Sequence, residues 1–374
     1  MMYLRCWIWC VSFFAVAFFG LNCGVPQDSS RPGQQLVAHK IRLYHVRLSP
    51  DGRHLSFIGA PEHKSPRWPC FYLINVSARS VEIYERPTLL SYEWCTKTGT
   101  RFFLFDSVFD AISVYDVNER ALAAQWSPPC PGGAEPAEAA MPDIRVIFPH
   151  YSDGRIYALV DAGDRAKAET LTIAELCDQH RWRPIVSGSI APAFWNFLDE
   201  GGIICTALGE GGEEIVSIYN VRTGERKDIA TGAFLGHSRR KTYIIYQGQA
   251  RDGDDVFLQS IETGKRVLLD DMILPGVFSF AGPFAWSRDD GRIAYVNRKG
   301  IYIYDVLADK GTQLTNDPGD IPWDWSEEGY VIFSRMDRIY VQKESEECCH
   351  LVFAVDEGIG DAIGVLNGEG HEDE

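Results

Sequence analysis

VRLSPDG, at residues 46–52, leads into LSFI at residues 55–58, and this short stretch contains the unit from which the fold can be worked out. An apolar segment enters a short polar turn that ends in glycine, and a second apolar segment leaves it. Asp51 and Gly52 place a residue with positive φ at the corner of a tight hairpin, a conformation that glycine adopts without steric cost. The stretch therefore predicts two antiparallel strands joined by a tight turn.

The same pattern returns along the chain. The clearest second copy is FAWSRDDG at residues 284–291, followed by IAYV at 293–296. Weaker copies end at Gly99, Gly154, Gly202 and Gly329, and one further copy, at residues 235–240, lacks the glycine. A second marker, a hydrophobic-polar-hydrophobic step, follows each turn, at residues 73–76, 114–117, 171–173, 218–221, 258–261, 303–306 and 339–341.

Turns and markers alternate strictly, and the turns recur at intervals of roughly 40 to 50 residues, which is the period of a four-stranded propeller blade. We therefore predict an all-β fold, a β-propeller of about seven four-stranded blades, with six or eight blades also open. Trp94, Trp195, Trp286 and Trp325 stand just before turns, and we expect them to pack between blades.

Composition agrees with this fold and excludes one class of partner. The chain has 34 Gly, 19 Pro and 12% aromatic residues, which suit short strands joined by tight turns. Its formal net charge is -16. Nucleic-acid phosphates would be repelled on average, and no basic stripe reverses this, so we expect no nucleic-acid partner.

Three motifs carry a family resemblance. SPDGR at 49–53, AWSRDDG at 285–291 and YIYDV at 302–306 resemble the repeats of WD40-like propellers of the TolB type, also called PD40 repeats. The resemblance is strong in the first and sixth units, fair in the second and seventh, and poor in the third to fifth. TolB also has an N-terminal α/β domain, for which the sequence before the first blade leaves no room, so the Tol-system role is not carried over.

The first 25 residues form a separate segment. Arg5 is followed by an apolar run from Cys6 to Leu21, which is typical of an export signal and short for a membrane span. Cys23 and Gly24 then resemble a bacterial lipoprotein signal, although Asn22 replaces the usual small residue. Lipidation at Cys23, an uncleaved anchor and an ordinary cleaved signal all stay open. We expect an exported protein of the bacterial cell envelope or periplasm, held at the membrane by this segment.

The N-terminal segment and the repeats together set the remaining domain boundaries. Residues 26–40 form a polar tether, residues 41–357 the propeller, and residues 358–374 an acidic tail without apolar periodicity, which we expect to be disordered. The outer strand of the last blade comes either from residues 349–355 or, in a second scheme, from residues 35–38. Either strand would hide a sheet edge that is otherwise prone to aggregation.

Catalytic motifs are absent from the sequence. It has no Gly-x-Ser-x-Gly elbow, P-loop, dinucleotide fingerprint or His-Glu-x-x-His pattern, so no catalytic residue and no cofactor is predicted. His45, His150 and His237 lie near the inner-strand ends of the first, third and fifth units and could hold a divalent metal in a central channel. Turn or core histidines are the simpler interpretation, and we do not predict a metal.

One loop is a candidate binding element. Residues 61–69 contain Arg67 and Trp68, and an exposed tryptophan flanked by cations on a rigid scaffold is typical of recognition sites.

Two functions from different classes remain. The first is an envelope binding or scaffold protein that holds a protein, peptide or glycan on one propeller face, and we expect this rather than an enzyme. The second is a lyase or glycosidase with its site in the central channel. The fold alone does not rank them, because propellers carry unrelated functions.

Overall fold

The structure is a computed structural model that describes residues 41–61, 70–85, 89–94, 100–106, 111–119, 121–126, 145–152, 155–161, 171–177, 181–198, 201–248, 255–269, 284–355 and 357–367. The chain divides into two units, Met1–Ala38 and His39–Glu374, and every described residue belongs to the second. None of the helices in these ranges has the length and apolar composition needed to cross a bilayer.

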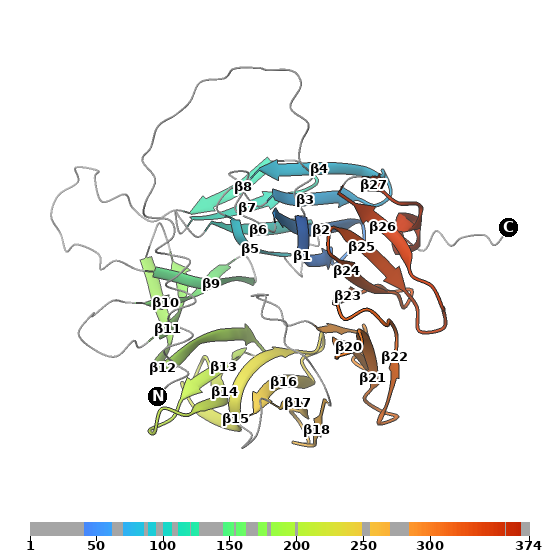
Figure 1. The fold of residues 1–374 in the computed structure, drawn as a ribbon. Coiled ribbons are helices and arrows are strands. Elements are labelled where there is room, and N and C mark those ends of the chain that lie inside the picture. The colour runs from blue at the N-terminus through green and yellow to red at the C-terminus, as the bar shows by residue number, and fades with distance from the viewer. Residues whose placement is uncertain are drawn as a thin grey trace, which may run out of the picture. The chain divides into compact units, whose positions relative to one another are not determined.

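Antiparallel strands are the main secondary structure of the described chain, and the strands of each blade follow one another in sequence order (Figure 1). Blade 1 contains β1 (Ile41–Leu48), β2 (His54–Pro61), β3 (Cys70–Asn75) and β4 (Ser80–Glu85). Blade 2 contains β5 (Leu89–Trp94), β6 (Arg101–Asp106), β7 (Ala111–Asp116) and β8 (Ala121–Trp126). Blade 6 contains β19 (Phe284–Trp286), β20 (Arg292–Val296), β21 (Ile301–Asp305) and β22 (Lys310–Gln313).

Blades 3, 4 and 5 are joined into one ten-stranded sheet by two long strands, β12 (Arg181–Phe197) and β15 (Arg226–His237). Each long strand is the outer strand of one blade and the inner strand of the next. The other strands are β9 (Arg145–Ser152), β10 (Arg155–Asp161), β11 (Leu171–Cys177), β13 (Gly202–Leu208), β14 (Glu214–Asn220), β16 (Tyr243–Gly248), β17 (Val256–Ser260) and β18 (Arg266–Leu268). Divided at the two long strands, the sheets give seven blades, as the repeats predict.

The last blade shows which segment follows β25 as its outer strand, a question for which the sequence offered two schemes. It contains β23 (Asp320–Trp325), β24 (Val331–Arg335), β25 (Arg338–Gln342), β26 (His350–Ala354) and a short β27 (Gly358–Ile359). β26 pairs with β25, so the scheme that used residues 349–355 is confirmed for the strand itself. Residues 35–38, which the second scheme used, lie outside the described residues.

The start of the acidic tail corrects one expectation. Residues 358–367, expected to be disordered, form β27 and the 3-10 helix η3 (Asp361–Asn367). Ala362, Ile363 and Leu366 are buried in the core that blades 1 and 7 share. These few apolar side chains, too short a series to show a period, are enough to fix the segment on β26. Residues 368–374 lie outside the described residues.

The blades are held together by apolar side chains that pack between neighbouring sheets. Trp94, Trp195, Trp286 and Trp325 are all at most 6% exposed, and each belongs to a core cluster that also contains residues of the preceding blade. Their expected position between blades is confirmed. Blades 1 and 7 are joined in the same way, and in addition Leu43 N donates to Met336 O at 3.0 Å while Ser334 Oγ donates to Leu43 O at 3.2 Å.

The turn between the first and second strands of a blade, called here an inner turn, has one construction in blades 1, 5, 6 and 7. Each inner turn begins with a serine whose Oγ accepts a backbone N–H at the far end of the turn. The bonds are His54 N to Ser49 Oγ at 2.9 Å, Tyr243 N to Ser238 Oγ at 3.1 Å, Arg292 N to Ser287 Oγ at 2.8 Å and Tyr330 N to Ser326 Oγ at 3.2 Å.

The residue three positions after each serine adopts the left-handed backbone conformation. These residues are Gly52 (φ 72°), Lys241 (φ 59°), Asp290 (φ 61°) and Gly329 (φ 88°). Each donates its N–H to the carbonyl of the serine, at 2.8, 2.9, 3.1 and 3.2 Å respectively. The expectation that glycine fills this corner is therefore wrong in blade 6, where Asp290 rather than Gly291 takes the positive φ. In blade 5, whose copy of the turn lacks the glycine, Lys241 takes it.

We expect opposite stability changes at two equivalent corners. A Cβ at Gly329 would meet no atom within 4 Å, so Gly329→Ala introduces only the left-handed strain and should lower the free energy of unfolding by about 1 kcal/mol. Lys241→Gly relieves that strain and should raise the free energy of unfolding by up to about 1 kcal/mol. Urea unfolding measures both. Gly319→Ala is the matched control, because Gly319 is not left-handed and the added Cβ would approach only the flexible Asp317 carboxylate.

Candidate functional site

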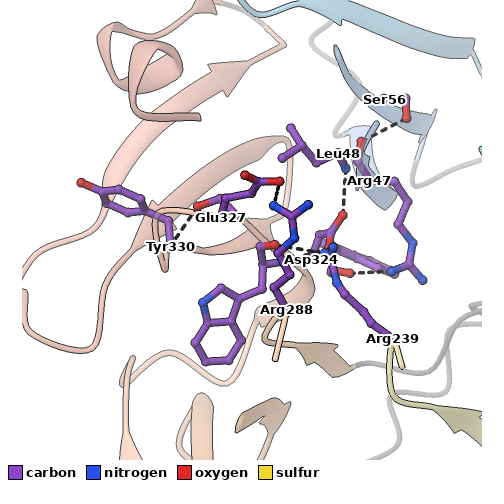
Figure 2. Close-up of polar contacts among 11 residues, drawn as sticks. Arg47, Leu48, Ser56, Arg239, Arg288, Asp324, Glu327 and Tyr330 are labelled. Carbon is purple, nitrogen blue, oxygen red and sulfur yellow. Dashed lines mark hydrogen bonds and ion pairs between the residues drawn. The ribbon is translucent and has the colours of Figure 1, made fainter. Parts of the chain in front are cut away.

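The inner turns bring a group of charged side chains to the ends of the innermost strands (Figure 2). Asp324 on β23 is at the centre, with Arg47 from β1 and Arg239 from the inner turn of blade 5 around it. Asp324 is placed there by a bulge in β23 between Pro322 and Asp324, which changes the register against β24.

The Asp324 carboxylate is almost fully buried and accepts hydrogen bonds from three directions. Its Oδ2 accepts Leu48 N at 2.9 Å, its Oδ1 accepts Trp325 N at 2.8 Å, and Oδ1 also accepts the Arg239 guanidinium. The Asp324 side chain is 8% exposed and that of Arg239 is 42% exposed. A buried carboxylate with a cation and two N–H donors is fully satisfied, so this group is a rigid joint rather than a reactive acid.

Arg239 and Arg47 tie this joint to other blades. Arg239 belongs to blade 5, yet it bonds Asp324 and donates to Trp325 O at 3.0 Å in blade 7, so its side chain extends past blade 6. Arg47 of blade 1 donates to Trp323 O at 2.9 Å. Three blades therefore meet through one carboxylate and the carbonyls on either side of it.

A second charged pair lies beside the joint and is exposed. Arg288 and Glu327, on the inner turns of blades 6 and 7, form an ion pair with side chains 58% and 55% exposed. Nearby, the Arg292 guanidinium lies over the Trp325 ring at 5.7 Å. Exposed pairs of this kind contribute little to stability.

Blade 5 presents the most cationic inner turn, Arg239, Arg240 and Lys241. The turn is fixed by Asp290 of blade 6, which is 3% exposed. The Asp290 carboxylate accepts Arg240 N at 3.1 and 3.2 Å and the Thr242 hydroxyl at 2.7 Å. The Arg239 guanidinium is paired with Asp324, whereas Arg240 is exposed, so a rigid turn presents the Arg240 guanidinium at the surface of an acidic protein.

The three histidines predicted as possible metal ligands all lie on inner strands, His45 on β1, His150 on β9 and His237 on β15. The His45 ring is 5.9 Å from the Trp323 ring, and burial lowers its pKa to about 3, with Arg47 adding to the effect. His237 Nδ1 is 2.6 Å from Ser238 O. The side chain of His150 is outside the described residues, so a shared metal site, which the sequence did not favour, stays an untested alternative.

Other predicted site residues cannot be placed. Cys23, Arg67 and Trp68 lie outside the described residues. Within the ranges that the structure covers, no three His, Cys, Asp or Glu side chains are grouped as a metal site would require.

The Asp324 joint and the cationic turn were not predicted from the sequence. Two signals could have found them. A charged residue between two tryptophans, as in Trp323-Asp324-Trp325, is either a bulge or a buried charge, and buried charges need partners. Three consecutive cations after Ser238 stand out in a chain with a net charge of -16.

Replacing the central carboxylate should weaken the contact between blades. In Asp324→Asn the amide would present an N–H₂ group either to Leu48 N–H or to Arg239, leaving a buried donor without an acceptor. The free energy of unfolding should fall by about 3 kcal/mol. Glu327→Gln, which removes the exposed Arg288 pair, is the matched control and should cost less than about 1 kcal/mol. Equal losses in the two variants would contradict the assigned role of Asp324.

His45 should make stability depend on pH. Its folded pKa of about 3 lies below the unfolded value of 6.5, so the unfolded state binds the extra proton between these values. The contribution of His45 is complete above pH 6.5 and is lost as pH falls toward 3, by about 1.4 kcal/mol per pH unit. His45→Asn, which tolerates the φ of 55°, should show a correspondingly shallower fall in urea unfolding across this range. Identical slopes would show that His45 is not the group responsible.

Comparison with known proteins agrees on the fold. No family model and no curated protein sequence matches the chain. Among solved structures, the β-propeller domain of the Trilobed protease from Pyrococcus furiosus is 11% identical, with 83% of this chain and 97% of that chain covered and a TM-score of 0.54. Oligogalacturonate lyase from Vibrio parahaemolyticus is 10% identical, with coverage of 84% and 89% and a TM-score of 0.53.

A third similar structure is the β-propeller domain of Cps50 (Swd1) from Myceliophteria thermophila, which is 10% identical, with coverage of 82% and 100% and a TM-score of 0.51. At such identities the likeness concerns the fold alone. The seven blades and these neighbours agree that the chain has the β-propeller fold.

Proposed function

We propose that this protein is a binding or scaffold protein that holds an acidic segment of a partner protein on the propeller face formed by the inner turns. The observation that carries the proposal is the cationic turn of blade 5. Arg240 projects from a corner that Ser238 and Asp290 hold in one conformation, beside Arg239, whose guanidinium is paired with Asp324.

The rigidity of this turn distinguishes it from an ordinary solvated charge run. Backbone N–H groups of Arg240 and Tyr243 are held by a buried carboxylate and a buried serine hydroxyl, so the turn is already ordered before a partner binds. Preorganised groups lose less conformational entropy on binding. Arg guanidinium groups also bind carboxylates through two parallel hydrogen bonds, which favours an acidic peptide over a neutral one.

The overall charge of the protein would also orient a bound partner. An acidic partner is repelled by most of a surface with a formal charge of -16 and is attracted by the cationic turn. Such an arrangement selects one docking direction, because wrong orientations place like charges together. A glycan without carboxylates would gain nothing from this feature, so we favour a protein or peptide partner over a neutral glycan.

We also propose that the protein acts in the bacterial cell envelope. The support is in the sequence: the apolar run from Cys6 to Leu21 resembles an export signal, and Cys23 resembles a lipidation site that would attach the chain to a membrane.

One observation supports the alternative function, an enzyme with its site in the central channel. His45 is held neutral by burial, and a neutral imidazole is the form that binds a metal. Elemental analysis of the purified protein separates the two functions. A stoichiometric metal that is lost in His45→Asn and in His237→Ala would favour an enzyme in the channel over the binding protein.

The binding function has a direct test in Arg240. A fluorescein-labelled oligoglutamate peptide should bind the protein with an affinity that falls as ionic strength rises, and Arg240→Gln should weaken binding by about tenfold. Fluorescence anisotropy measures both. Lys310→Gln, an equal charge change on an exposed residue of β22, is the matched control and should leave the affinity unchanged.

An oligoglutamine peptide of the same length should not bind. The proposal fails if Arg240→Gln and Lys310→Gln weaken oligoglutamate binding equally, because the attraction would then be a general charge effect.

A further inference from the structure

A groove of about 310 Å³ opens between the outer strands of blades 4 and 5. Ile229 and Ala230, on the blade 4 half of β15, form one wall. Phe257 on β17 and Arg266 on β18 form the other wall. The groove belongs neither to the inner turns nor to the channel, so a ligand bound there is independent of the proposed function.

Strand register places the polar groups of the groove side by side. Gln259 and Arg266 are directly paired between β17 and β18, and Phe257 lies two residues before Gln259 on the same face of the strand. The Arg266 guanidinium lies 5.3 Å from the centre of the Phe257 ring. An arginine, an amide and an aromatic ring therefore face blade 4 together.

The Arg266 guanidinium has no carboxylate partner among the residues that the structure describes. It lies over the Phe257 ring, which orients the cation but does not neutralise it. In a chain with 52 acidic residues and 36 basic ones, an arginine without a carboxylate at the edge of a groove is available to an anion.

Gln259 is the second indication. The residue is 9% exposed, and its Oε1 accepts the Tyr246 hydroxyl at 3.2 Å. Within the described part of the chain, its Nε2 donates no hydrogen bond, although it borders the groove. The amide donor is therefore open to the groove, where a ligand or water can accept its hydrogen bond.

We propose that this groove is a binding site for a small aromatic carboxylate. The carboxylate would accept hydrogen bonds from Arg266 and from Gln259 Nε2, a charge-assisted bond joined by a neutral one. The ring would pack between Ile229 and Ala230 on one side and the edge of the Phe257 ring on the other, because Tyr246 stacks on Phe257 and Arg266 lies over its ring. A volume of about 310 Å³ accommodates a single ring with its carboxylate.

The test uses benzoate as the probe on the purified full chain, with binding followed by isothermal titration and by chemical-shift changes. Benzoate should bind with a Kd on the order of 1 mM, a value typical of a fragment of this size. Benzyl alcohol, which keeps the ring and loses the charge, and acetate, which keeps the charge and loses the ring, should each bind about tenfold more weakly.

Two variants address the polar contacts. Gln259→Glu keeps an acceptor for the Tyr246 hydroxyl and replaces the amide donor with a negative charge, so benzoate binding should be lost. Arg266→Gln should weaken benzoate binding about tenfold. Arg222→Gln, an equal charge change on the nearby β14–β15 turn outside the groove, should leave the affinity unchanged and is the matched control.

A further variant keeps the proposal testable if either of these fails to fold. Ala230→Phe fills the groove from the opposite wall and should abolish benzoate binding without touching a charge. Wild-type protein that does not bind benzoate at all would overturn the proposal, as would benzoate affinity that is the same in wild type and in every folded groove variant. Acetate binding as tight as benzoate binding would overturn the assignment of an aromatic ligand.

Discussion

The structure depends on closing a contact between two ends of the described chain that are nearly 300 residues apart. Leu48 N and Asp324 Oδ2 are separated by 276 positions in the sequence, and Ser334 and Leu43 by 291. Bringing such distant segments together costs chain entropy before any contact offsets it, so blades 1 and 7 need strong, specific interactions. Asp324 supplies them as a buried carboxylate satisfied from three sides, and the shared core with Trp323 and Phe353 adds the apolar contribution.

The inner turns show how one local solution can carry different residues. In all four described examples the serine hydroxyl and carbonyl fix the turn, and the position three residues later is left-handed, whether it holds Gly52, Lys241 or Asp290. The serine, not the glycine, is therefore the constant element. This frees the remaining turn positions to vary in charge, so that a cationic turn in blade 5 and an acidic turn in blade 7 occur on the same scaffold.

The fold could be predicted from the sequence because each blade repeats the same local sequence pattern: an apolar strand, a polar turn and another apolar strand. The prediction of local structure was less accurate where the sequence departs from this pattern. The turn after Ser238 looked irregular because Lys241 stands where glycine was expected, and residues 358–367 looked disordered because Ala362, Ile363 and Leu366 show their role only against β26. The site was missed for a different reason: Arg239 and Asp324 are 85 positions apart, and no local pattern reveals that pairing.

The path of strand β15 between two blades has a consequence for local unfolding. It crosses from blade 4 to blade 5 through Gly232, whose φ of 139° lets the backbone pass so close to Gln247 O that a Cβ there would lie 2.1 Å from that oxygen. With β12 acting likewise, blades 3 to 5 are joined by strands that pass from one blade into the next, whereas the other blades meet mainly through side chains. Local opening should therefore follow this boundary: amides of β12 and β15 exchange with solvent as one cooperative unit, and the blades on either side behave as separate units.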